Sequence, residues 1–131
     1  MAGLHARFLS QANGPLPDPL PRIRFGPCPP YRQFSGCDYP RAIWLNRWDW
    51  LKRRPLYHEV THWLDFQYLS DANREVIRQR YGWPDVAWWW DSSPERQGLE
   101  PNCERLAWAG TEMYLHPRKY RWLRAYLRGI V

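Results

Sequence analysis

Apolar residues recur at helical spacing between residues 55 and 69, near the middle of the chain. At about 100° per residue they cover one side of this predicted helix, and Pro55 suits its first turn because a missing N–H costs nothing there. The opposite side carries polar groups, among them His58, His62 and Asp65. A helix that packs on one side and presents titratable groups on the other is expected to be central in the fold.

Three more helices are predicted downstream of this one. The pair Ser70-Asp71 supplies an N-cap for a helix over residues 72–81. Further helices are expected over Asn102–Leu115 and over residues 118–128. The last helix is amphipathic, with leucines on one side, and its arginines are interpreted as a solvated face. These are Arg121, Arg124 and Arg128.

Short β-strands are predicted before the central helix. Arg22–Phe25 alternates charged and apolar side chains, and Ala42–Leu45 is an apolar run that ends before Asn46. A further strand is expected over residues 31–35, followed by a turn over residues 36–38. The predicted fold is therefore α+β, with a small N-terminal sheet, antiparallel or mixed, packed on three to four helices.

Length and proline content determine the predicted domain organisation. With 131 residues the chain has the size of one domain. Prolines alternate with other residues from Pro15 to Pro21, which favours an extended course. Residues 1–21 are therefore expected to form a proline-rich irregular arm, and residues 22–131 a single monomeric domain. The start lacks the apolar run of a signal peptide, and no apolar stretch is long enough to span a membrane.

Net charge and unusual residue types narrow the choice of partners. The formal charge of +6 permits an acidic partner, but the basic stripe on the last helix is short and no nucleic-acid-reading motif accompanies it, so nucleic-acid contact is not expected. Three cysteines without a close Cys-x-x-Cys pair favour reduced thiols, with a Cys28–Cys37 disulfide left open. The ten tryptophans are interpreted as packing residues, and the run from Trp88 to Trp90 as either packing or a binding surface.

The central helix carries the sequence His58-Glu59-x-x-His62. Residues four apart lie one above the other on a helix, so the two imidazoles can bind one metal ion. Glu59 lies about 100° away around the helix, where its carboxylate can reach a metal-bound water without being a ligand. A zinc ion with two such nitrogens, a third ligand and an open position supports hydrolysis, with the carboxylate as general base.

The third ligand has to come from elsewhere in the chain. One known pattern requires a glycine three residues and a histidine or aspartate six residues after the second histidine, but these positions hold Asp65 and Tyr68. The other pattern takes a glutamate from a downstream helix. Glu104 fits it, near the start of a predicted helix whose small residues allow close helix contact. Glu100 and Glu112 remain alternatives, and a carboxylate at a helix start is also favoured by the helix dipole alone.

Together these residues resemble a known group, the small gluzincin-like zinc metallopeptidases of the compact kind common in actinobacterial and bacteriophage genomes. The resemblance rests on His58-Glu59-x-x-His62-x-x-Asp65 and on Pro101-x-x-Glu104-Arg105-x-Ala107-x-Ala109. It implies a minimal zincin-like fold with one zinc ion per chain. The implied ligands are His58, His62 and Glu104, and Glu59 is the implied base.

The resemblance also implies an activity, the hydrolysis of a peptide bond by a zinc-bound water that Glu59 activates. Asp65 is expected to support the site by holding a ligand or the packing of helix and loop, with a plain surface carboxylate as the alternative. Thr61 departs from the family, where a glycine often precedes the second histidine. A donor to the developing oxyanion is also needed. Its candidates are Tyr31, Tyr57, Arg105, Tyr114 and His116.

The implied partner is a protein or peptide substrate in the cytoplasm of a bacterial or host cell. The alternative is a structural or interaction protein that keeps a zinc site for stability, for example a virion-associated or tail-associated component of a phage, without turnover. Its tryptophan run and proline-rich arm would then be the binding surfaces. Replacing Glu59 by glutamine distinguishes the two, because catalysis needs the carboxylate and assembly does not.

Overall fold

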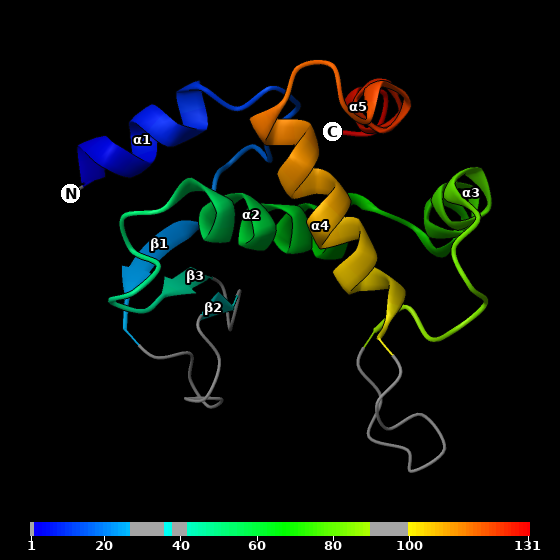
Figure 1. Cartoon of the computed structure of the whole chain (residues 1–131), viewed down its shortest axis with the longest axis horizontal. Helices are drawn as coiled ribbons and strands as arrows, with labels where there is room; N and C mark the ends of the chain where they lie inside the picture. The colour runs from blue at the N-terminus through cyan, green and yellow to red at the C-terminus, as the bar shows by residue number, and fades with distance from the viewer. Residues whose placement is uncertain (1, 27–35, 38–41, 90–99) are drawn as a thin grey trace, which may run out of the picture.

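The computed structural model describes residues 2–26, 36–37, 42–89 and 100–131. Its one small sheet lies at one side of the molecule, next to α2 (Figure 1). In chain order the elements are α1 (Ala2–Ser10), β1 (Arg22–Phe25), β2 (Gly36–Cys37), β3 (Ala42–Leu45), α2 (Arg53–Tyr68), α3 (Asp71–Tyr81), α4 (Asn102–Leu115) and α5 (Arg121–Arg128). This mixed content confirms the predicted α+β class. None of the described helices is long and apolar enough to cross a membrane.

The helices from α2 to α4 follow the sequence pattern closely. The bounds of α4 are those predicted, and α3 begins one residue before the predicted start. Its N-cap is Ser70, whose side chain accepts a hydrogen bond from the Asn73 backbone N–H while the Asn73 side chain accepts one from the Ser70 N–H. Gly82 ends α3 in the left-handed conformation that favours glycine. The central helix α2 begins at Arg53, with Pro55 in its first turn.

Residues 2–10 differ from the prediction. They form α1 instead of an irregular course, because the prolines begin only at Pro15 and the residues before them are mostly good helix formers. Leu9 is buried in the core, and Nε2 of His5 lies 2.8 Å from the Trp50 carbonyl oxygen. The expectation of an irregular arm therefore holds for residues 11–21 alone, which contain no helix or strand.

Residues 11–21, the irregular arm, contact helices α4 and α2. The backbone N–H and the side-chain amide of Asn13 both donate to the Tyr114 carbonyl oxygen, at 3.0 and 2.9 Å. The Tyr114 hydroxyl donates in return to the Pro15 carbonyl oxygen at 2.6 Å. Farther along, the Tyr68 hydroxyl donates to the Asp18 carbonyl oxygen at 2.8 Å. The arm is thus fastened to the C-terminal ends of both α4 and α2.

The sheet has the strand order β1-β3-β2 and is mixed. Strand β1 runs parallel to β3, and β2 runs antiparallel to it. Of the two predicted forms the wholly antiparallel one is therefore wrong, since β1 and β3 are not joined as a hairpin but by a crossover that lets β2 pair on the far side of β3. Gly36 and Cys37 were expected in a turn, but they form β2 opposite Leu45 and Trp44. The strand predicted over residues 31–35 lies outside the described residues.

The central position predicted for the histidine-bearing helix is confirmed. Helix α2 contacts β2 and β3 and packs most extensively against α4, which crosses it (Figure 1). Burial of apolar side chains drives this packing. The fully buried side chains with the largest volumes come from β3, α2, α3, α4 and α5: Tyr57, Tyr114, Ile43, Leu45, Leu56, Leu64, Ile77, Leu106, Met113, Leu123, Leu127 and Val60.

The crossing of α2 and α4 is close because one residue has no side chain. A Cβ atom placed on Gly110 would lie 2.3 Å from Oγ1 and 2.5 Å from Cγ2 of Thr61. Thr61 is buried, and its hydroxyl donates to the Tyr57 carbonyl oxygen at 2.8 Å, so it has no free direction in which to move. The expected close approach of the two helices is present, the predicted small residues Ala107 and Ala109 are buried, and Gly110 adds a point of contact that the sequence did not single out.

The last helix, α5, differs from the prediction in where it begins and in the burial of Arg124. It begins at Arg121, later than expected, after Tyr120 with a left-handed backbone (φ 53°). Leu123 and Leu127 are buried as predicted. Arg124 was expected in a solvated face, but it is only 8% exposed, because its guanidinium binds the carbonyl oxygens that α4 leaves without partners at its C-terminal end.

The helix contact at Gly110 leads to a first prediction. Gly110→Ala should lower the free energy of unfolding by about 2 kcal/mol, because the added methyl group overpacks the contact with Thr61. Urea unfolding followed by circular dichroism measures the change. Gly3→Ala is the matched control, a glycine in α1 with nothing within 4 Å of the added Cβ, and it should be neutral or stabilising. Equal effects of the two changes would show that the crossing is not sterically limited.

Candidate metal centre

Three of the residues singled out from the sequence lie together where α4 crosses α2. Nε2 of His58 is 3.3 Å from one carboxylate oxygen of Glu104, and Nε2 of His62 is 2.8 Å from the other. One potential ligand atom from each residue lies within 4.8 Å of the other two. Within the described part of the chain, this is the group of His, Cys, Asp and Glu side chains that could hold a metal ion.

These distances suit a small tetrahedral cation. A zinc ion with bonds of about 2.0–2.1 Å holds its ligand atoms about 3.3 Å apart. The two measured nitrogen–oxygen distances, 3.3 and 2.8 Å, are near that value. Two imidazoles and one carboxylate also form the donor set of known catalytic zinc sites. The side chains are 12–19% exposed, so the cluster is largely shielded from water but not closed.

The position of Glu104 depends on how the chain enters α4. The backbone N–H groups of Asn102 and Cys103 donate to the carbonyl oxygens of Ala87 and Trp88, at 3.0 and 2.8 Å. The Asn102 side chain, fully buried, donates to the Pro84 carbonyl oxygen at 2.9 Å. These bonds satisfy N–H groups that a helix start leaves without partners. They also fix the first turn of α4, and with it the Glu104 carboxylate.

The electrostatics keep Glu104 ionised. Burial raises the pKa of its carboxyl, but the bonds to His58 and His62 outweigh burial and hold the pKa well below its ordinary value. The first turn of α4, where Glu104 lies, favours negative charge as well. The predicted dipole effect and a ligand role are therefore compatible. A carboxylate that is charged at neutral pH is ready to bind a cation.

The outer nitrogen of His58 departs from the usual arrangement. Histidine ligands commonly donate their second N–H to a carboxylate or a backbone carbonyl, which fixes the tautomer. Nδ1 of His58 is buried and has no hydrogen-bond partner in the described structure. The ring is held instead by packing, since Trp108 lies 4.4 Å away between ring centroids and His62 lies 4.8 Å away.

Glu59 and Asp65, also singled out from the sequence, are buried on the same helix. Glu59 directly follows His58 and is 7% exposed. Asp65 is fully buried, and its carboxylate accepts hydrogen bonds from Nε of Arg74 at 2.9 Å and from the Trp88 indole at 2.6 Å. Burial raises the pKa of Asp65, against the lowering effect of these two donors. Asp65 thus joins α2 to α3 and to the Trp88 loop, which excludes a plain surface role.

The two alternative third ligands, Glu100 and Glu112, pair with residues outside the cluster. Glu100 is paired with Arg105, at 3.7 Å. Glu112 accepts a hydrogen bond from Arg54 at 2.6 Å, and this bond, followed by one from Lys119, lowers its pKa. Neither belongs to the cluster that could hold a metal ion, and Glu104 does.

The predicted oxyanion donors are mostly committed to other partners. The hydroxyl groups of Tyr57 and Tyr114 donate to carbonyl oxygens of Phe8 and Pro15. Arg105 donates to the Glu100 carbonyl oxygen, and Nε2 of His116 lies 3.3 Å from Glu112. Tyr31 lies outside the described residues. The four described candidates therefore serve the fold in this structure.

The structure adds aromatic side chains that the sequence analysis did not connect with the site. Trp108 packs on His58 and is 52% exposed. Phe66, 67% exposed, lies 6.3 Å from Trp89 between ring centroids. Helical spacing could have found two of them, because Trp108 follows Glu104 by four residues and Phe66 follows His62 by four. Of the tryptophan run, Trp88 packs inward, Trp89 is exposed, and Trp90 lies outside the described residues.

Comparison with known proteins adds no family. No protein-family model, no curated protein and no solved structure matches the chain. The assignment of the cluster therefore depends on its own geometry and chemistry.

The cluster predicts a specific metal content. Wild-type protein supplied with zinc should carry one zinc ion per chain, and Glu104→Ala should weaken zinc binding at least about 100-fold because a charged ligand is lost. Mass spectrometry of the native protein and a competition titration with a chelator measure these values. Glu112→Ala is the matched control on the same helix and should bind zinc as wild type does. Equal binding by all three proteins would move the third ligand elsewhere.

Asp65 and Asp71 both pair with Arg74, and the two ion pairs should contribute differently to the stability of the fold. Asp65→Asn should cost about 3 kcal/mol of unfolding free energy, because Arg74 loses a buried countercharge. Asp71→Asn removes the other ion pair of Arg74. The Asp71 side chain is 100% exposed, so this change should cost much less than Asp65→Asn. Chemical unfolding of both variants provides the comparison. Similar losses would show that burial does not decide the contribution of Asp65.

Proposed function

We propose that this protein is a zinc-dependent peptidase, with His58, His62 and Glu104 as the metal ligands. The observation that carries the proposal is the approach of both imidazole Nε2 atoms to the two oxygens of one carboxylate, from a helix that is separate in sequence. Two nitrogens from one turn of helix and one carboxylate leave room for a fourth, exchangeable position on a tetrahedral ion. That open position is what distinguishes a catalytic site from a structural one.

The chemistry divides between the metal and the protein. A zinc ion bound here would lower the pKa of a water molecule and polarise a substrate carbonyl. Glu59, on the same helix turn as His58, is the group that would accept the proton from the attacking water and pass it to the leaving amine.

The remaining residues position this machinery. Arg74 and Trp88 hold Asp65, three residues after His62, and thereby fix α2 against the loop that leads into α4. Trp108 fixes the His58 ring and presents half of its own surface to solvent. We infer that an extended peptide would lie over α2 and α4 beside Trp108. Such a site is compatible with a protein or peptide substrate in a bacterial or host cytoplasm.

A second candidate function is a zinc-stabilised interaction protein, such as a component of a phage virion or tail, without turnover. The observation in its favour is the set of exposed aromatic side chains near the cluster, since exposed apolar surface commonly marks a partner site. In this function the zinc ion would stabilise the crossing of α2 and α4. Glu59 would then have no chemical role.

Glu59→Gln tests the two functions against each other. The glutamine variant should keep one zinc ion per chain but lose about 10²–10⁴-fold of the peptide cleavage rate, because the amide cannot accept the proton. Cleavage is measured by mass spectrometry of a peptide library derived from a bacterial proteome. Glu75→Gln, an exposed carboxylate on α3, is the control and should cleave as wild type does.

If the zinc-loaded wild type cleaves nothing in the library, the peptidase proposal fails and the interaction protein becomes the better account. If Glu59→Gln cleaves as fast as wild type, Glu59 is not the base. Zinc content is measured on the same samples, so that loss of activity is never confused with loss of the metal.

A further inference from the structure

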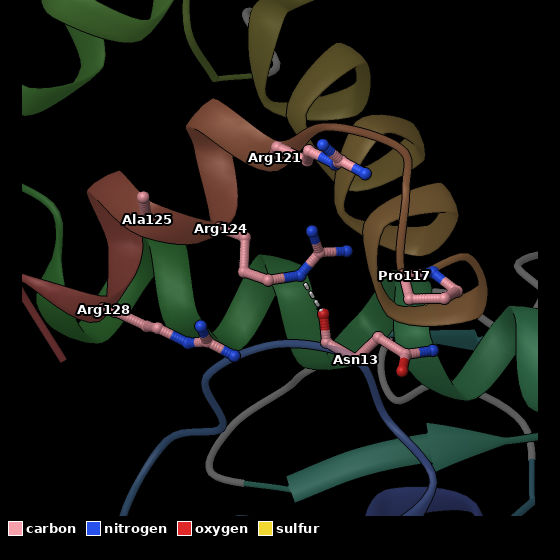
Figure 2. Close-up of a pocket in the computed structure, with 6 residues that line it drawn as sticks. All are labelled: Asn13, Pro117, Arg121, Arg124, Ala125 and Arg128. Carbon is pink, nitrogen blue, oxygen red and sulfur yellow. Dashed lines mark hydrogen bonds between the residues drawn. The ribbon is translucent and has the colours of Figure 1, made fainter.

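A second polar site lies at the opposite end of α4 from Glu104. A hollow of about 400 Å³ opens between α5 and the segment that follows α1 (Figure 2). Its volume falls in the range of small-ligand pockets, about 300–1,000 Å³. The lining residues are Asn13, Pro117, Arg121, Arg124, Ala125 and Arg128. The lining thus contains three guanidinium groups and no carboxylate.

The three arginines belong to one face of α5. At about 100° per residue, Arg121, Arg124 and Arg128 fall within an arc of about 60°. Figure 2 shows their side chains extending from α5 toward Pro117 and Asn13, with Arg124 between the other two. Arg121 and Arg128 are exposed, and Arg124 is buried. The predicted solvated face therefore holds for Arg121 and Arg128, and Arg124 is the exception.

The Arg124 side chain, which lines the hollow, is held in place by hydrogen bonds. Its Nε donates to the Asn13 carbonyl oxygen, and its Nη2 donates to the carbonyl oxygens of Met113, His116 and Lys119, at 2.8, 3.0 and 3.2 Å. Among the described residues, these four bonds involve Nε and Nη2 and not Nη1. They also hold the guanidinium group in one orientation, so that this side chain would lose little further conformational entropy when a ligand binds. Binding sites require this kind of preorganisation.

The positive charge at this site is not balanced by the protein. Arginine stays protonated in proteins, and within the described residues none of these three arginines takes part in an ion pair. Carbonyl oxygens supply only partial charges to Arg124. Its pKa is lowered, first by burial and then by the charges of Arg128 and Arg121. A dianion in the hollow would offset this repulsion.

We propose that the hollow binds a phosphate group, either as free inorganic phosphate or as the phosphomonoester of a small molecule. Guanidinium groups bind phosphate oxygens through paired N–H donors, and three of them line this hollow. A nucleic-acid backbone would need positive charge along a longer track than the three residues of this one helix face provide. The site is separate from the candidate metal centre and does not depend on the proposed peptidase function.

Isothermal titration calorimetry tests the proposal on the whole chain. Inorganic phosphate and glycerol 3-phosphate are titrated separately, in chloride of constant ionic strength, and at least one should bind with a Kd below the millimolar range. Tighter binding of inorganic phosphate identifies the free ion as the ligand, and tighter binding of the ester identifies a phosphorylated small molecule. Absence of heat from both overturns the proposal.

Variants locate the binding. Arg121→Ala with Arg128→Ala should weaken it at least tenfold, and both side chains are exposed, so that the fold is retained, as circular dichroism will verify. Arg118→Ala is the charge-matched control, an exposed arginine outside the lining, and should bind as wild type does. Glu104→Ala should also bind as wild type does, because zinc at the other site is not the receptor. An equal loss in Arg118→Ala, or no loss in the double variant, would overturn the proposal.

Discussion

The close crossing of α2 and α4 is the contact on which the candidate site depends. Thr61 packs against the bare backbone of Gly110, and the neighbouring His62 faces Glu104 across the same interface. Histidine and carboxylate side chains are short, so a separation of the helices by even one methyl group would pull their ligand atoms apart. Protein interiors are densely packed and relax little, so steric fit at one glycine governs the geometry of three polar residues.

A buried polar network secures that crossing from one end. Asp65 accepts hydrogen bonds from Arg74 and Trp88, and the first backbone N–H groups of α4 donate to carbonyl oxygens of the loop that carries Trp88. Such a network is costly to bury but leaves few of its groups without a partner, which is the condition under which it specifies a single arrangement. At the other end, Arg124 satisfies the carbonyl oxygens where α4 stops. Both ends of α4 are thus fixed by other segments, through loop carbonyl oxygens at its start and through the Arg124 guanidinium at its end.

Local features of the chain were predictable because they depend on neighbours in sequence. The cap at Ser70, the stop at Gly82 and the apolar run of β3 each follow from residues within one or two turns. Helix α1 does not follow from the proline pattern, because the prolines favour an extended course only from Pro15 onward. The burial of Arg124 was missed for a different reason, since an amphipathic pattern cannot reveal that a distant helix offers its free carbonyl oxygens to an arginine.

By itself, the sequence determined the α+β class, the helices from α2 to α5 and the placing of His58 and His62 on one helix face, because backbone propensity and helical periodicity are local. It also favoured Glu104 as the third member of the site, with Glu100 and Glu112 as alternatives. Only the tertiary structure decided which of those carboxylates lies beside the two histidines, the direction of β1 and the partners of Asp65 and Arg124. These depend on which surfaces meet, and that is decided by packing between segments far apart in the chain.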